Sequence, residues 1–188
     1  MNSAIVVENL SNAVIIQFNR PEIRSPLSIF VLEQLHEFFD ENANNQIIFT
    51  GKADVFASGA DLREIAKVTG ETAEEFALRG QHLMDKIAKT NSIAAINGFC
   101  FGGALDLALA CRNRIASPNA LFSHPGANLG IMTGWGGTQR LTRLIGEAAA
   151  LEMFLTSKRV AADEALKIGL IDRLSTNPLE TALELLAE

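Results

Sequence analysis

Short apolar runs alternate with longer stretches of helical periodicity along this chain of 188 residues. Two apolar runs, residues 4–10 and 13–18, flank a polar pair, which predicts a β-hairpin. Ser28 is a suitable N-cap for the helix that follows. The apolar stripe of that helix comprises Val31, Leu32, Leu35, Phe38 and Phe39. Residues 46–51, with the sequence QIIFTG, then predict a short buried strand.

The second half of the chain continues this alternation. Thr72 and Glu75 have capping-box spacing at the start of an amphipathic helix. Residues 92–97 predict another buried strand, and residues 114–117 and 120–123, separated by Pro-Asn, predict a pair of strands. A glycine-rich turn then leads into a helix, and two or three more helices complete the chain. Strands alternating with helices indicate an α/β fold.

Composition and charge narrow the class of protein. The chain is 48% hydrophobic with a formal net charge of -6, which is typical of one globular domain over residues 1–188. The acidic balance argues against a nucleic-acid partner. No apolar run approaches the roughly 20 residues of a membrane span, so none is expected. Cys100 and Cys111 have neither metal-ligand nor redox spacing, so we expect buried thiols and a reducing, cytoplasmic location.

The sequence FASGAD, residues 56–61, is the first candidate for chemistry. Gly59 allows backbone conformations denied to other residues and Ala60 adds little bulk, so a ligand could approach the main chain here. Asp61 is a suitable N-cap for a helix that follows. The same six residues also fit an ordinary connection between a strand and a helix, and both interpretations stay open.

The second candidate is GFCFGGALD, residues 98–106, where a strand passes through Gly102 and Gly103 into an apolar helix. Backbone N–H groups in a first helical turn lack intrahelical acceptors, so they can hold an oxyanion if a second donor converges on it. Asp106 lies three residues after Gly103 on the same helix face, which places a carboxylate beside that amide. A first-turn acid is also stabilised by the helix dipole, by roughly 0.3–1 kcal/mol, so a purely structural role stays open.

Other patterns lack the signatures of nucleotide binding and of serine hydrolysis. The third glycine cluster, TGWGGTQR, is no P-loop, GFCFGG lacks dinucleotide-binding spacing, and FASGA is not a serine-hydrolase elbow. We interpret Trp135 as a packing residue. His36 and His82 lie in helical stretches and are expected at the surface or its boundary, whereas His124 lies on a loop and is a further candidate. No ligand cluster or nucleotide fingerprint is present, so we expect no metal and no redox cofactor.

Five segments, taken together and in order, resemble the crotonase superfamily, which is the enoyl-CoA hydratase/isomerase family. They are NRPEIRSPLS, IIFTGKADVFASGADLREI, IAAINGFCFGGALDLALACRNRIAS, LGIMTGWGGTQRLTRLIG and LTSKRVAADEALKIGLID. The resemblance implies the ClpP/crotonase fold, an α/β spiral of ββα units. It also implies an acyl-CoA thioester substrate, with coenzyme A as part of that substrate, and a homotrimer or hexamer.

By this resemblance, two backbone amides bind the thioester oxygen and stabilise an enolate-like intermediate. They map onto Ala60 and Gly103, where the residues themselves already indicate open backbone. The substrate-binding residues that the resemblance implies are Ala60, Asp61, Leu62, Arg63 and Gly103. The RSPLS stretch and the loop before Ala60 are expected to contact the CoA portion.

The acids of the family are only partly present. Its hydratases use two glutamates that share one water; Asp106 occupies the first position and Gly126 the second. Some isomerases of the family carry an acid slightly later, where this chain has Gly134. His124, two residues before Gly126, is the remaining candidate for the missing group. The resemblance therefore implies a lyase or isomerase of fatty acid metabolism in which Asp106 is the acid/base candidate.

Several functions fit one carboxylate beside an oxyanion hole. Hydration lacks its second acid, whose contribution would be on the order of 100- to 10,000-fold. Isomerisation, decarboxylation, thioester hydrolysis and non-catalytic acyl-CoA binding are the alternatives. Relative to the family, the segment near residues 42–46 is short, and the C-terminal helices that usually cover the acyl pocket are expected to be short or missing.

Overall fold

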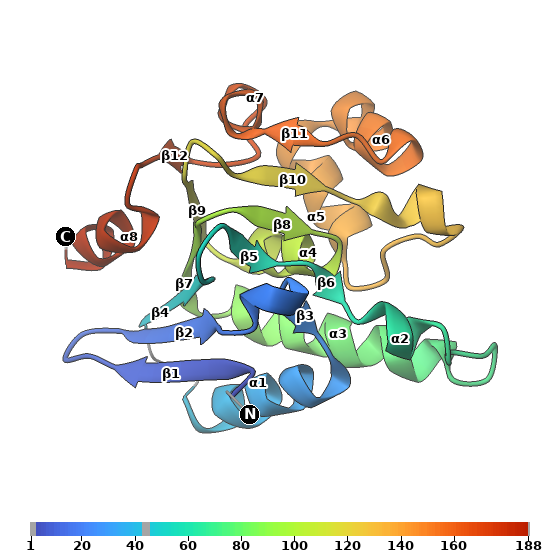
Figure 1. Ribbon diagram of the computed structural model, residues 1–188, viewed down its shortest axis with the longest axis horizontal. Coiled ribbons are helices and arrows are strands. Elements are labelled where there is room, and N and C mark those ends of the chain that lie inside the picture. The colour runs from blue at the N-terminus through green and yellow to red at the C-terminus, as the bar shows by residue number, and fades with distance from the viewer. Residues whose placement is uncertain (1–2, 43–45, 188) are drawn as a thin grey trace.

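The computed structural model describes residues 3–42 and 46–187, so part of the short segment near residues 42–46 lies outside the described residues. The largest unit is a six-stranded sheet in the order β1-β2-β4-β7-β9-β12 (Figure 1). Its strands are β1 (Ile5–Asn9), β2 (Val14–Phe18), β4 (Gln46–Thr50), β7 (Asn91–Ile96), β9 (Asn113–Ala116) and β12 (Arg173–Leu174). β1 and β2 pair antiparallel, which confirms the predicted hairpin, and the other neighbours pair parallel.

A smaller sheet of four strands lies beside the first, in the order β11-β10-β8-β5. Its strands are β5 (Val55–Ala57), β8 (Phe99–Phe101), β10 (Leu121–Ser123) and β11 (Val160–Ala161). The strands β3 (Pro26–Leu27) and β6 (Gly59–Ala60) form a separate parallel pair.

The predicted pairing of residues 114–117 with residues 120–123 is wrong. The first segment forms β9, beside β7 in the six-stranded sheet, and the second forms β10, beside β8 in the four-stranded sheet. The Pro-Asn turn between them carries the chain from one sheet to the other, so each strand finds its hydrogen-bond partners elsewhere.

Eight α-helices and two short 3₁₀ helices occupy the described residues. They are η1 (Pro21–Ile23), α1 (Ile29–Glu41), α2 (Leu62–Ile65), α3 (Ala73–Ala88), α4 (Gly103–Ala110), η2 (Pro125–Leu129), α5 (Gly137–Ile145), α6 (Glu147–Thr156), α7 (Ala162–Lys167) and α8 (Pro178–Ala187). The predicted cap of α1 is confirmed, since Ser28 Oγ accepts a hydrogen bond from the Val31 amide.

The predicted capping box at the start of α3 is wrong. Thr72 Oγ1 accepts a hydrogen bond from the Thr69 amide at 2.9 Å, so it does not cap α3. Glu75 instead pairs with Arg79 at 2.9 Å along the same helix. The preceding loop therefore competes successfully for the threonine side chain.

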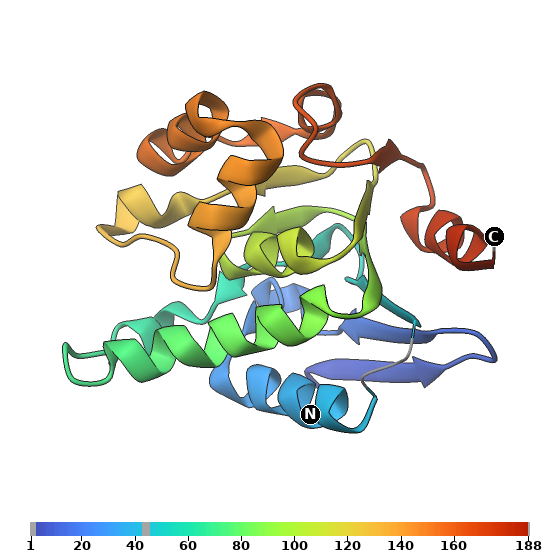
Figure 2. The same ribbon diagram turned by 180° about the vertical axis from the view of Figure 1, so that it is seen from behind.

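The inner strands β2, β4, β7 and β9 of the six-stranded sheet are buried on both faces, whereas most of the edge strand β1 is exposed. Successive side chains along a buried strand therefore belong to different cores. Ile16 of β2 and Ile47 of β4 pack into the main core with α1, α3 and α4. Ile15 and Ile48, one residue away, belong to a second apolar cluster that includes Ala182 of α8. Figure 2 shows α4 between α3 and α5, at the centre of the molecule.

The described residues include no helix long and apolar enough to cross a membrane. Cys100 and Cys111 are both buried and unbonded to one another, which confirms their interpretation as buried thiols.

Candidate functional site

Three parallel strands bring the candidate segments to one edge of the four-stranded sheet (Figure 1). The strands β5, β8 and β10 are followed directly by Ser58, Gly102 and His124. The Gly102 amide donates a hydrogen bond to the Ser123 carbonyl at 2.9 Å, which ties two of these strand ends together. Carboxyl ends of parallel strands meet at the same edge, where α/β proteins place their ligands.

Gly59 packs against the start of α4. Its φ is +86°, and a Cβ atom there would lie 2.6 Å from the Gly103 nitrogen. The glycine therefore permits a close approach of two backbone segments, whereas the sequence suggested only the approach of a ligand. Ala60 comes next in β6, and Ala60 and Gly103 both line one cavity.

This cavity has a volume of about 310 Å³ and a predominantly apolar wall. Apolar side chains in the wall include Leu62, Phe76, Ile131, Met132, Trp135 and Phe154. Its polar side chains come from Ser58, His124 and Thr133, and none of the described residues that line it carries a side chain that is charged at neutral pH. An arrangement of this kind fits an apolar ligand with one polar group held at a defined point.

Trp135 fills the space between two helices beside the cavity. A Cβ atom at Gly80 of α3 would lie 2.1 Å from the indole, and one at Gly103 of α4 would lie 2.3 Å from it. The side chain is buried, which confirms its interpretation as a packing residue. It also fixes the position of the Gly103 backbone.

Asp106 has no exposed surface, although it lies only one turn from Gly103. Thr133 Oγ1 donates a hydrogen bond to Asp106 Oδ2. Close packing extends to Gly137, where a Cβ atom would lie 1.9 Å from Asp106 Oδ1. Burial raises the pKa of the Asp106 carboxyl to about 7, with the Thr133 hydrogen bond and the charge of Arg140 acting in the opposite direction. Both protonation states of the carboxyl are therefore populated near neutral pH.

His124 lies on the other side of this carboxyl and is 3% exposed. Its Nε2 is 3.5 Å from Asp106 Oδ1, and its ring packs on Phe154 at 5.0 Å between centroids. Burial lowers the pKa of the imidazole to about 4, so the ring is neutral at physiological pH. Among the described residues, the two ring nitrogens of His124 have no hydrogen-bond partner, and Asp106 Oδ1 has none either.

Gly126 and Gly134, where the resemblance to the crotonase superfamily implies further acids, both line the cavity. A Cβ atom at Gly126 would lie 2.4 Å from the Ile131 carbonyl oxygen, so the backbone there leaves no room for a side chain. A Cβ atom at Gly134 would meet only the Ala77 methyl, at an ordinary 3.6 Å. The site therefore accepts a new side chain at position 134 but not at position 126.

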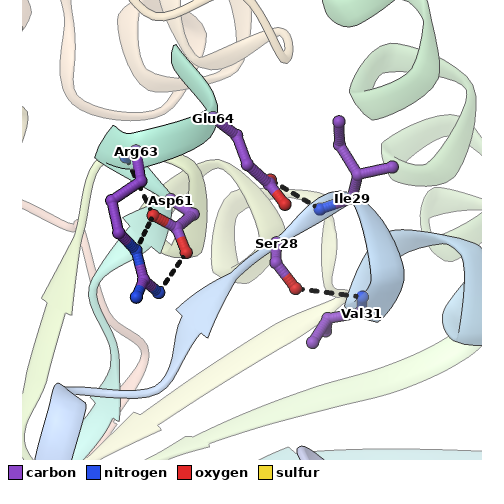
Figure 3. A network of polar contacts seen from close by, with 6 residues as sticks. All are labelled: Ser28, Ile29, Val31, Asp61, Arg63 and Glu64. Carbon is purple, nitrogen blue, oxygen red and sulfur yellow. Dashed lines mark hydrogen bonds and ion pairs between the residues drawn. The ribbon is translucent and has the colours of Figure 1, made fainter. Parts of the chain in front are cut away.

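The segment from Ala60 to Arg63 divides between the cavity and the surface. Ala60 and Leu62 line the cavity. Asp61 is buried, and its Oδ1 accepts hydrogen bonds from the Arg63 amide and Nε, both at 2.9 Å (Figure 3). This confirms Asp61 as the cap of α2. The guanidinium of Arg63 is the main cause of the lowered Asp61 pKa, and the arginine itself is exposed.

A second contact anchors this segment to the preceding helix. Glu64 Oε2 accepts a hydrogen bond from the Ile29 amide at 2.7 Å, beside the Ser28 cap (Figure 3). The start of α1 is thus held to α2. Together with the pairing of β3 and β6, this fixes the backbone around Ala60.

Sequence reasoning missed Thr133, Gly137 and Glu64. The first two belong to the glycine cluster that lacks a P-loop signature, where Gly137 makes room for Asp106 and Gly136 for the side chain of Arg140. Such a cluster signals close packing of backbone and side chains even where it binds no phosphate. Nothing in the local sequence around Glu64 indicates that it reaches α1.

The other histidines lie away from the cavity. His82 is exposed and His36 is half-buried with Nε2 2.9 Å from the Arg79 carbonyl oxygen, in agreement with their expected positions. The described residues contain no group of three or more metal-ligating side chains.

Comparison with known proteins agrees with this architecture. The sequence profile of the enoyl-CoA hydratase/isomerase family matches residues 8–187. A short-chain-enoyl-CoA hydratase from Clostridium acetobutylicum is 33% identical over 177 residues, which cover 90% of this chain and 68% of that protein.

Solved structures show the same fold. The enoyl-CoA hydratase from Bacillus anthracis superposes with a TM-score of 0.91 at 33% identity, over 98% of this chain and 76% of that one. DspI from Pseudomonas aeruginosa superposes with a TM-score of 0.92 at 32% identity, over 99% of this chain and 80% of that one. The expected crotonase fold is therefore confirmed, and the chain belongs to the enoyl-CoA hydratase/isomerase family.

Proposed function

We propose that this protein acts on an acyl-CoA thioester through an enolate whose oxygen is held by the backbone amides of Ala60 and Gly103. The observation that carries the proposal is the close packing of Gly59 on the Gly103 nitrogen, beside the cavity that Ala60 and Gly103 line. It puts the start of β6 against the N-terminus of α4. A thioester carbonyl between the two segments would meet the positive end of the α4 dipole.

Two donors are needed because the reaction places negative charge on the thioester oxygen. Removing a proton from the carbon next to the thioester converts the carbonyl into an enolate. A fixed amide directed at that oxygen stabilises the transition state by roughly 3–4 kcal/mol, as judged from the loss of one such donor in other enzymes.

The wall of the cavity favours an uncharged, apolar acyl group. An acyl chain would lie against side chains such as Phe76, Met132 and Phe154. A malonyl-type substrate would bring its carboxylate into a cavity whose wall offers no cation among the described residues, and burying an unpaired charge is costly. This argues against decarboxylation. A volume of about 310 Å³ is at the small end for ligand pockets and suits the acyl group without the nucleotide.

Double-bond isomerisation is the reaction that these residues favour. One proton leaves a carbon of the acyl chain, which gives the enolate, and returns to another carbon, so one proton-carrying carboxyl such as Asp106 is enough when a side chain at the cavity wall connects it to the substrate. The carboxyl's pKa of about 7 suits both directions of transfer. Hydration is the second candidate, because the similar Clostridium acetobutylicum protein is a short-chain-enoyl-CoA hydratase. The homotrimer or hexamer and the cytoplasmic location stay predictions.

Exchange of the α-proton tests the enolate without assuming which product forms. We expect the wild-type protein to incorporate deuterium from D₂O into the α-carbon of octanoyl-CoA, measured by mass spectrometry. Asp106→Asn should lose exchange and still bind the ligand in calorimetry. Binding without exchange by the wild-type protein would contradict the proposal and favour a non-catalytic acyl-CoA-binding protein. Products from crotonyl-CoA, a β,γ-unsaturated acyl-CoA and a malonyl-CoA then identify the reaction.

A further inference from the structure

Asp106 is fully buried and is not among the residues that line the cavity, so a proton on it must reach a substrate through a neighbouring side chain that does line it. Two side chains contact the carboxyl and also line the cavity. Thr133 donates its hydroxyl proton to Oδ2, and His124 places Nε2 at 3.5 Å from Oδ1. Each is a candidate for the connection between Asp106 and the ligand.

The chemistry of the two side chains separates them. A threonine hydroxyl is a poor base, and this one already donates its proton to the carboxyl. A neutral imidazole has one nitrogen that accepts and one that donates, so it can take a proton at one nitrogen and release one from the other. His124 is also the side chain whose nitrogens both lack a partner among the described residues. A buried polar group left unsatisfied in this way calls for an explanation.

We propose that His124 is the second proton-carrying residue of this site and that it passes protons between the Asp106 carboxyl and the bound thioester. His124 replaces the acid that the resemblance implies at position 126, where the Ile131 carbonyl leaves no room for a side chain. This inference rests on the proposed function.

The proton transfer balances without any further reactant. The imidazole accepts the α- or γ-proton of the acyl group at Nδ1, and the electrons of that C–H bond move to the thioester oxygen, giving the enolate. The proton on Nε2 passes to Asp106 Oδ1. In the return step, Asp106 gives its proton back to Nε2, and Nδ1 delivers one to the other carbon as the enolate collapses.

The surroundings of the Asp106 carboxyl and the His124 imidazole favour one proton shared between the two groups. Phe154 of α6 covers one side of the ring, and the ionisable groups coupled to Asp106 from neighbouring elements are Arg140 of α5 and Cys100 of β8. The cysteine is buried and its pKa is raised well above the usual value, so it stays protonated. Only Arg140 brings a permanent charge, and it bonds directly to Asp85 rather than to the pair.

The test measures α-proton exchange of octanoyl-CoA in His124→Gln, Thr133→Val and a matched control, His82→Gln, which changes an exposed histidine outside the cavity. We expect His124→Gln to slow exchange by about 100-fold or more, the range for a general acid–base group. Thr133→Val should slow it less, and the control should match the wild type. Imidazole added to His124→Ala should restore exchange, an effect that a structural role would not give.

Each other outcome overturns the inference. If His124→Gln exchanges the α-proton at the wild-type rate, or if only Thr133→Val loses exchange, the imidazole does not carry the proton. Loss without imidazole rescue would make His124 structural. If the variants do not fold, ¹⁵N-histidine NMR of the wild type decides: a 3-oxoacyl-CoA that forms a bound enolate should shift the His124 signal, and an unshifted signal contradicts the inference. Absence of exchange in the wild type would refute the proposed function itself.

Discussion

Replacing Asp106 by asparagine is expected to stabilise the folded protein at alkaline pH while it removes the proton-carrying carboxyl. The variant keeps the shape of the side chain: the amide oxygen can accept the Thr133 hydrogen bond, and the amide nitrogen can donate toward His124 Nε2 once the imidazole carries its proton on Nδ1. Unlike the carboxyl, the amide stays neutral at every pH. It therefore avoids the burial of a negative charge that the wild type suffers once Asp106 ionises.

The magnitude follows from the pKa of Asp106. Burial raises it from 3.8 to about 7, so the folded state holds a proton that the unfolded state releases. Stability conferred by this group therefore falls as pH rises from about 4 to about 7 and then stays level. At about 1.4 kcal/mol per pKa unit, the whole loss is about 4 kcal/mol. About 2 kcal/mol of it falls between about pH 5.5 and about pH 8.5.

Denaturant unfolding of the wild type and Asp106→Asn at these two pH values is the assay. The free energy of unfolding of the variant, relative to the wild type, should rise by about 2 kcal/mol from the lower pH to the higher. Asp61→Asn is the matched control. The pKa of Asp61 is lowered by Arg63, so its contribution is lost only at more acid pH and its difference from the wild type should not change in this window. An equal difference at both pH values for Asp106→Asn would contradict a raised pKa for Asp106 in the folded protein.

Further predictions concern the walls of the cavity. Gly126→Glu should lower the melting temperature, because the Ile131 carbonyl leaves no room for its side chain. Gly134→Glu should fold and add a carboxylate to the cavity, which should raise the rate of hydration of crotonyl-CoA. Equal melting temperatures of the two variants would contradict this. Gly137→Ala should lower the free energy of unfolding by roughly 1–3 kcal/mol, because its Cβ would overlap Asp106; unchanged denaturant unfolding would oppose it. The fluorescence of Trp135, the sole tryptophan, should change when octanoyl-CoA binds but not when free CoA binds. If calorimetry shows that octanoyl-CoA is saturating and the fluorescence does not change, the acyl group lies elsewhere.

Local patterns were reliable where the interaction they describe stays within a few residues. The hairpin of β1 and β2, the Ser28 cap and the Asp61 cap all depend on neighbours in the sequence. The start of α4 at Gly103 is of the same kind. The capping box at Thr72 is the exception: it is equally local, but the Thr69 amide three positions earlier offered that side chain a competing partner.

Tertiary structure decided everything that depends on distant segments. The sequence places β9 and β10 only a turn apart, but the choice of sheet depends on β7 and β8, which lie elsewhere in the chain. It likewise indicates Asp106 and His124 as candidates without showing that they meet. Their proximity comes from the parallel pairing of β8 with β10, and their pKa values come from the surrounding core that excludes water. Caps and periodicity act along the backbone, whereas desolvation and strand pairing depend on what the rest of the fold puts next to each group.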